Sequence, residues 1–196
     1  MFQVRIHGRG GQGVVTATEL LSIAAFEEGA FAQAFPSFGS ERTGAPVVAF
    51  CRIDDKEIRL REPILEPDAL IVQDPTLFKV IDVFHGLRPQ GYLLVNTNKN
   101  FGDLHIAAKV ANIPAGHART VNATELALKH VGRPVPNAAL LGAFAALSGV
   151  VHLKSVVSAI RQAFPGKVGE ANVAAATAAY EAAAAGQAVG EGTTLC

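Results

Sequence analysis

The pattern with the clearest chemical meaning is the glycine-rich run Gly8-Arg9-Gly10-Gly11-Gln12-Gly13. It lies between an alternating apolar run over residues 2–7 and a run of helical periodicity over residues 14–26. A strand, a glycine turn and a helix start in this order direct backbone N–H groups and the positive end of the helix dipole at an anion. Because the glycines match the G-x-G-x-x-G spacing, we predict a phosphate-binding turn. The alternative is a tight turn that binds no ligand.

A site for NAD usually has a second mark, an acidic residue about 20 positions further on, where the second strand ends. This chain has no carboxylate between residues 30 and 36, and the next ones are Glu41 and Asp54. We therefore expect the turn to bind an anion other than NAD.

A second polar segment, residues 35–46, reads as a loop because of its glycines and prolines. It follows a short predicted strand over residues 30–34, so it leaves that strand at the edge where open α/β sheets bind ligands. Its Glu41-Arg42 pair has two interpretations. It is either an exposed ion pair of little energy or a cation positioned for a phosphate or carboxylate.

Composition excludes several classes of protein. The 196 residues carry 17 basic and 17 acidic side chains without a basic run, so nothing indicates nucleic-acid binding. Because 49% of the residues are hydrophobic and only 17% are charged, we expect part of the apolar surface to meet a partner. The chain starts with a strand rather than a signal sequence, and its longest uncharged apolar run, residues 138–151, is too short to span a bilayer. We expect a cytoplasmic protein without a membrane span.

Metal chemistry is also not expected of this chain. Its two cysteines, Cys51 and Cys196, are too few to hold an iron–sulfur cluster. The six histidines show no pair at metal-ligand spacing on one helix.

The elements that must position the glycine turn indicate an α/β fold with a mostly parallel twisted sheet. Short continuous apolar runs over residues 69–72 and 92–95 predict buried parallel strands, and residues 117–121 predict another. Extended runs on either side of Asp54-Asp55, residues 47–53 and 56–60, predict an inserted β-hairpin. A helix is predicted over residues 77–84, and a capping box starts another at Asn122. A C-terminal helical segment is predicted over residues 138–147, 153–164 and 168–185.

We expect residues 1–188 to form a single domain, because no linker long enough to separate domains interrupts them. Residues 189–196 are expected to be a flexible tail.

Several motifs together resemble one family. They are GRGGQGVVTA (residues 8–17), AFPSFGSERTGAPV (34–47), the run 68–74, LLVN (93–96), PNAALLGA (136–143) and GEAN (169–172). Over residues 1–180 the chain resembles the gamma subunit, or gamma domain, of the 2-oxoacid:ferredoxin/acceptor oxidoreductases. The resemblance is to pyruvate:ferredoxin oxidoreductase and to the branched-chain and aryl 2-oxoacid enzymes rather than to the 2-oxoglutarate type.

The resemblance implies an activity that belongs to a complex. Family members oxidatively decarboxylate a 2-oxoacid on thiamine diphosphate with Mg, pass electrons through [4Fe-4S] clusters and form an acyl-CoA. This chain has neither a Gly-Asp-Gly thiamine motif nor cluster-binding cysteines. The resemblance therefore implies a non-catalytic or site-completing subunit that is inactive alone. Its implied partners are thiamine-binding alpha and beta subunits and a ferredoxin-like delta subunit or domain.

The resemblance also implies a role for both polar segments. They are expected to help form the coenzyme A site, while no residue is assigned to catalysis or to a metal. The expected contacts are Gly8, Arg9, Gly10, Gly11, Gln12 and Gly13 in the turn, and Ser37, Ser40, Glu41, Arg42 and Thr43 in the loop. Two alternatives remain open, namely a purely architectural subunit and a stand-alone nucleotide-binding or NAD-dependent protein.

Overall fold

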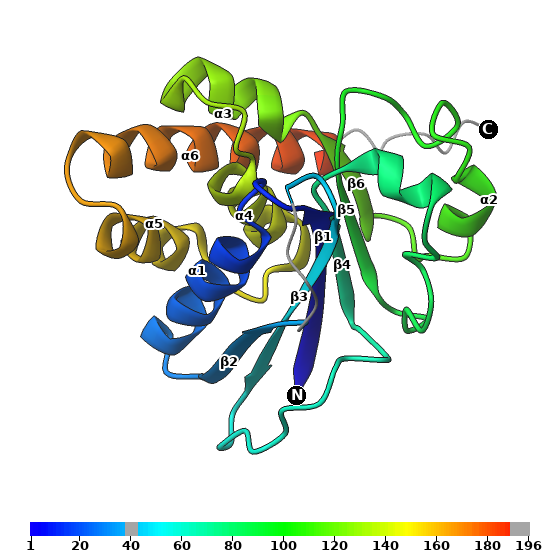
Figure 1. Cartoon of the computed structure of the whole chain (residues 1–196), viewed down its shortest axis with the longest axis horizontal. Coiled ribbons are helices and arrows are strands. Elements are labelled where there is room, and N and C mark those ends of the chain that lie inside the picture. Colours follow the sequence, from blue (N-terminus) through cyan, green and yellow to red (C-terminus); the bar gives the residue numbers. More distant parts are fainter. Residues whose placement is uncertain (38–42, 189–196) are drawn as a thin grey trace.

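A six-stranded sheet forms the centre of the molecule in the computed structural model, which describes residues 1–37 and 43–188 (Figure 1). The strand order is β2-β3-β1-β4-β5-β6. The strands are β1 (Phe2–Arg9), β2 (Phe31–Pro36), β3 (Pro46–Asp54), β4 (Ala69–Val72), β5 (Tyr92–Asn96) and β6 (Ala118–Val121).

The sheet is mostly parallel, as predicted. β1 pairs in parallel with β4, β4 with β5, and β5 with β6. β3 runs antiparallel to both of its neighbours, β1 and β2. β2 therefore points in the same direction as β1, although β3 separates them.

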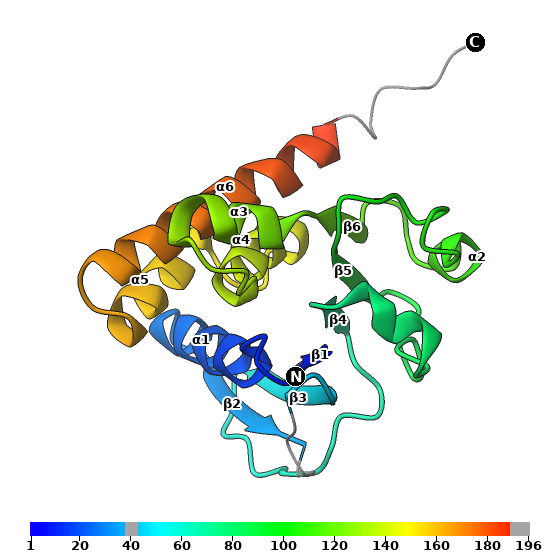
Figure 2. The ribbon, with the colours of Figure 1, turned by 45° about the horizontal axis from the view of Figure 1, so that its top comes forward.

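Five helices cover one face of the sheet (Figures 1 and 2). They are α1 (Val14–Glu27), α3 (Ala123–Val131), α4 (Asn137–Ser148), α5 (Leu153–Ala163) and α6 (Lys167–Ala188). The opposite face is covered by the short 3-10 helix η1 (Pro75–Lys79), by α2 (Ala107–Val110) and by loops. α4 is buried along nearly its whole length and contacts β5 and β6, whereas α5 packs on α1, α4 and α6. None of the helices in the described part of the chain has the length and apolar character that crossing a membrane requires.

Both faces of the central strands contribute to the core. Along β4, Ala69 and Ile71 face α1 and α4, whereas Leu70 and Val72 join a smaller cluster under η1. Strands buried on both faces read as continuous apolar runs. β1 differs, because Val4 and Ile6 enter the larger core while Arg5 and His7 form a buried polar face on the other side.

The predicted hairpin around Asp54-Asp55 is wrong. β3 has β1 on one edge and β2 on the other, so neither edge is open to residues 56–60. The Arg52 guanidinium donates to the carbonyls of Leu60 (3.3 Å) and Glu62 (2.7 Å), which gives them partners without a strand ladder. Residues 56–60 therefore cross the surface as an irregular segment, and the hairpin of this sheet is made by β2 and β3.

The helix predicted over residues 77–84 is also replaced by another structure. Asp74 caps η1 by accepting a bond from Thr76 N (2.9 Å), and the helical turn ends at Lys79. The carbonyls of Val83 and His85 accept hydrogen bonds from the buried Arg5 guanidinium at 2.8 and 2.6 Å. A side chain from β1 thus contacts the irregular segment that follows η1.

Candidate functional site

The glycine-rich run forms the connection between β1 and α1. β1 ends at Arg9, and α1 begins at Val14 with Gly13 as its N-cap. Gly11 and Gly13 have φ values of 95° and 72°, a region that side chains with a Cβ rarely adopt. At Gly8 a Cβ would lie 2.6 Å from Val14 Cγ2, so the helix packs directly on the strand there.

A cavity of about 330 Å³ opens at the start of α1. The turn and the first residues of α1, Gly10 to Thr16 without Gln12, line it together with Arg9 and Val47. The first turn of a helix leaves backbone N–H groups without partners inside the helix, and here no side chain caps them. No acidic residue lies in this turn of α1, so the positive end of the helix dipole is not neutralised there. The cavity is therefore suited to an anion such as a phosphate.

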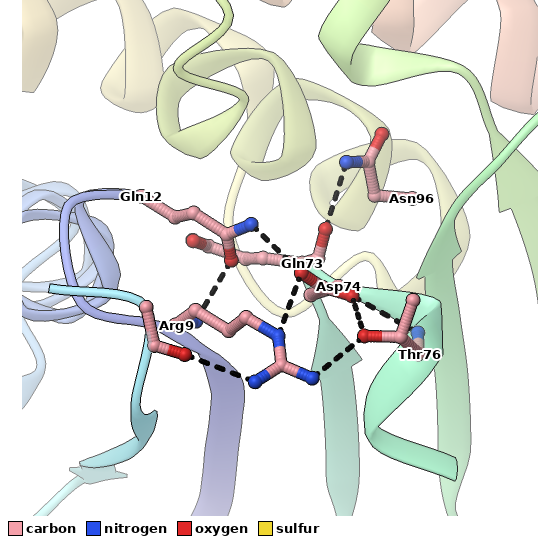
Figure 3. Close-up of polar contacts among 7 residues, drawn as sticks. Arg9, Gln12, Gln73, Asp74, Thr76 and Asn96 are labelled. Atoms are coloured by element: carbon pink, nitrogen blue, oxygen red, sulfur yellow. Dashed lines mark hydrogen bonds and ion pairs between the residues drawn. The ribbon is translucent and has the colours of Figure 1, made fainter. Parts of the chain in front are cut away.

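The side chains of Arg9 and Gln12 point toward Asp74, at the end of β4 (Figure 3). Asp74 Oδ2 accepts hydrogen bonds from Arg9 Nε (3.2 Å) and Gln12 Nε2 (3.1 Å). The other two guanidinium nitrogens of Arg9 donate to Gly44 O (2.9 Å) and Thr76 Oγ1 (2.8 Å). These contacts tie the turn to the carboxyl end of β4 and to the loop before β3.

Asp74 is the centre of this network. Partial burial raises the pKa of its carboxyl group, but hydrogen bonds from Thr76 and Gln12 and the charge of Arg9 outweigh burial and lower the pKa. Asp74 is therefore ionised at neutral pH and matches the charge of Arg9 within the chain. The spacing of the glycine motif gives no signal for this residue, because it lies more than 60 positions away.

The predicted loop begins and ends beside the turn. Ser37 N donates to Val48 O (2.9 Å), and Thr43 forms a bridge with Gly10. Gly44 N donates to Gly10 O (3.1 Å), and Gly10 N donates to Ala45 O (2.9 Å). The described ends of the loop and the glycine turn thus lie at one edge of the sheet. Three of the predicted loop contacts, Ser40, Glu41 and Arg42, lie outside the described residues.

The polar ends of the buried strands complete this edge. Asn96, the last residue of β5, donates through Nδ2 to Gln73 O and to Thr124 Oγ1, both at 2.8 Å. Thr124 N in turn donates to Asn96 Oδ1 at 3.1 Å. The residues that end or follow β4 and β5 are polar, which suits their place at this edge.

The turn lies at the point where the connections leave the sheet toward opposite faces. The connection after β1 leads to α1, whereas the connection after β4 leads to η1 on the other face. In open α/β sheets, ligands bind at the carboxyl ends of the strands at such a switch point. No acidic side chain from β2 serves as a ribose contact, because residues 30–36 carry none and β3 separates β2 from β1.

The chemistry of the side chains does not fit a metal cluster. Cys51 is fully buried in β3, and burial raises the pKa of its thiol to about 12. A protonated, enclosed thiol does not ligate iron. Within residues 1–37 and 43–188, no three His, Cys, Asp or Glu side chains are grouped as metal ligands.

The fold and site define an α/β chain with a glycine-rich βα turn at the switch point of the sheet. Comparison with known proteins is more specific, because residues 3–182 match the family described as pyruvate ferredoxin/flavodoxin oxidoreductase. The chain belongs to this family and is of its gamma type.

Relatives of the chain support this assignment along nearly its full length. The chain is 49% identical to pyruvate synthase subunit PorC of Methanocaldococcus jannaschii over 180 residues, which is 92% of this chain and 96% of the relative. It is 48% identical to the pyruvate/ketoisovalerate oxidoreductases common subunit gamma of Thermococcus kodakarensis, with the same coverage. The crystal structure of pyruvate oxidoreductase subunit PORC from Thermotoga maritima is 37% identical with a TM-score of 0.76, covering 92% of this chain and 95% of that one.

Proposed function

We propose that this chain is the gamma subunit of a 2-oxoacid oxidoreductase complex that forms an acyl-CoA, and that its glycine turn contributes to the coenzyme A site. The observation that carries the proposal is the 46–49% identity to PorC and common gamma subunits over 82–92% of this chain. Pyruvate and ketoisovalerate, named for those relatives, are the 2-oxoacids we expect. Thiamine diphosphate with Mg and the [4Fe-4S] clusters are assigned to partner subunits.

The cavity at the start of α1 supports the coenzyme A role. Coenzyme A carries a pyrophosphate and a 3′-phosphate, and helix N-termini bind such groups through backbone N–H donors. In this interpretation the backbone of Gly10 to Gly13 contacts the phosphate, and Arg9 and Gln12 hold the backbone in place through Asp74. The subunit then binds and orients coenzyme A, and the bond-forming steps belong to the thiamine subunits.

An architectural subunit is the second candidate, and one observation favours it. The charge of Arg9 is already matched by Asp74 inside the chain, so the most conspicuous cation of the motif needs no ligand. In that case the turn serves only to join β1, β3 and β4.

A charge placed in the cavity separates the two candidates. Thr16 lines the cavity in the first turn of α1, where an acidic residue favours the helix. In the intact complex, Thr16→Glu should raise the apparent KM for coenzyme A at least about tenfold, because like charges repel at a binding site. Thr16→Gln is the matched neutral control and should leave that KM within about threefold. The KM for the 2-oxoacid should not change in either variant.

An intact Thr16→Glu complex with unchanged coenzyme A kinetics would favour the architectural role. Gel filtration of the chain expressed alone and with its genomic neighbours tests the subunit assignment separately. Co-purification with iron–sulfur and thiamine subunits is expected, whereas a stable monomer that binds nucleotides alone would contradict it.

A further inference from the structure

Two amide side chains flank the glycine turn from outside the run that forms it. Gln73 follows β4, and its Cβ lies 3.2 Å from the position that a Cβ on Gly8 would take. Asn137 is the first residue of α4, and its Nδ2 lies 2.6 Å from the corresponding position on Gly13. The two glycines are what allow these side chains to approach the turn so closely.

The side-chain amide of Gln73 is buried and unpaired within the described part of the chain. Only 1% of its surface is exposed, and its Oε1 and Nε2 have no hydrogen-bond partner among the residues that the structure describes. Its side chain extends from the end of β4 toward Gln12 (Figure 3). Because an unpaired buried amide destabilises a fold, such a group indicates a bound molecule or a functional role.

Asn137 presents a donor in a fixed orientation. Its Oδ1 accepts a hydrogen bond from Ala138 N (2.8 Å), so Nδ2 is the atom that faces Gly13. The residue is only 5% exposed, and in the described ranges Nδ2 donates to no acceptor. Gly13, which this donor contacts, also lines the cavity at the start of α1.

The amino ends of two helices meet at this contact. Gly13 is the N-cap of α1, a helix of 14 residues, and Asn137 opens α4, a helix of 12 residues. Neither helix has an acidic residue in its first turn. Two helix dipoles therefore direct unneutralised positive ends toward one place, which favours an anion there.

We propose that Asn137 and Gln73 are ligand-binding residues that extend the coenzyme A site from the turn to α4. Their amide nitrogens donate hydrogen bonds to a phosphate of coenzyme A held between the amino ends of α1 and α4. This inference rests on the proposed function, since it takes the identity of the ligand from there. It adds two residues that lie outside both polar segments of the sequence.

The first test is Asn137→Asp in the intact complex. An aspartate keeps the acceptor for Ala138 N and is favourable at a helix start, so the fold is kept. It replaces the donor by a negative charge, and the apparent KM for coenzyme A should rise roughly 10- to 100-fold. Asn112→Asp, which adds the same charge to an exposed position after α2, is the matched control and should leave this KM unchanged.

The second test is Gln73→Leu, which removes the unpaired amide at similar volume. Because an apolar side chain is more stable at a buried position than an unpaired amide, the melting temperature of the complex should not fall. The KM for coenzyme A should nevertheless rise several-fold, with the KM for the 2-oxoacid unchanged. If Gln73 only holds a structural water, the KM for coenzyme A stays at the wild-type value, and the role of Gln73 is refuted.

The outcomes also separate this inference from the proposed function. If Thr16→Glu raises the KM for coenzyme A while Asn137→Asp does not, coenzyme A binds at the turn without α4, and the inference is wrong. If Thr16→Glu has no effect, the proposed coenzyme A role itself fails. Elevated KM values in Thr16→Glu and Asn137→Asp, with the Asn112→Asp control unaffected, are the expected result.

Discussion

Stability at mildly acidic pH should depend on one buried histidine of β1. His7 is 6% exposed, and its Nε2 accepts a hydrogen bond from Arg5 Nε at 3.0 Å. Burial and the adjacent positive charge of Arg5 lower the pKa of His7 to about 3. The imidazole is thus neutral in the folded chain, and its Nδ1 is buried without a partner among the described residues.

The consequence follows from linkage between protonation and folding. The unfolded chain binds a proton at His7 below a pKa of about 6.5, whereas the folded chain does not until about pH 3. Stability is therefore fully present above pH 6.5 and falls as the pH decreases below it. Between pH 7.5 and pH 5.5 this residue should remove about 1 kcal/mol from the free energy of unfolding.

Urea unfolding of the purified chain at the two pH values measures this quantity. His7→Gln offers Arg5 a neutral acceptor that does not titrate, so the stability lost between pH 7.5 and 5.5 should be about 1 kcal/mol smaller than in the wild type. Comparing the two proteins removes the contribution that the other histidines make to the pH dependence of stability. Equal losses, or an imidazole NMR signal of His7 that titrates near pH 6, would refute the reasoning.

Three further predictions concern packing, an ion pair and the loop. Gly142→Ala should lower the free energy of unfolding by about 1–3 kcal/mol in urea, because the new Cβ would lie 1.9 Å from Ala176 O between α4 and α6. Glu28→Gln should lower the free energy of unfolding by about 1 kcal/mol at pH 7, because it weakens the contacts with His152. Partial burial raises the pKa of Glu28, but hydrogen bonds from His152 and Ser155 lower it overall. The difference between variant and wild type should therefore disappear in unfolding measurements as the pH falls through that lowered pKa. Arg42→Ala should raise the KM for coenzyme A by one to two orders of magnitude in steady-state assays if the loop contacts the ligand, as its sequence indicates.

Much of the sheet could be predicted because its signals are local. β4 and β5 are buried on both faces, so each reads as a continuous apolar run with polar residues at its end. The glycine turn was equally clear, because Gly11 and Gly13 adopt backbone conformations that require glycine.

A buried arginine of the sheet contacts each of the two segments whose predicted structure was wrong. Arg52 takes the carbonyls of Leu60 and Glu62, and Arg5 takes those of Val83 and His85. Residues 56–60 also have no free edge of β3 to pair with, because β1 and β2 occupy both edges. The contacts of Arg5 join residues 78 and 80 positions apart, so a short sequence window does not contain them.

The site shows the same division between local and distant signals. The motif predicted the turn, but the partner of its polar side chains is Asp74, at the end of another strand. With Arg9 and Gln12 bound to Asp74, the site proposed at the turn relies on backbone N–H groups and on the amides of Gln73 and Asn137. Ligand affinity should therefore depend more on the charge and shape of the cavity than on the motif's own arginine, whose substitution would first disturb the join between β1 and β4.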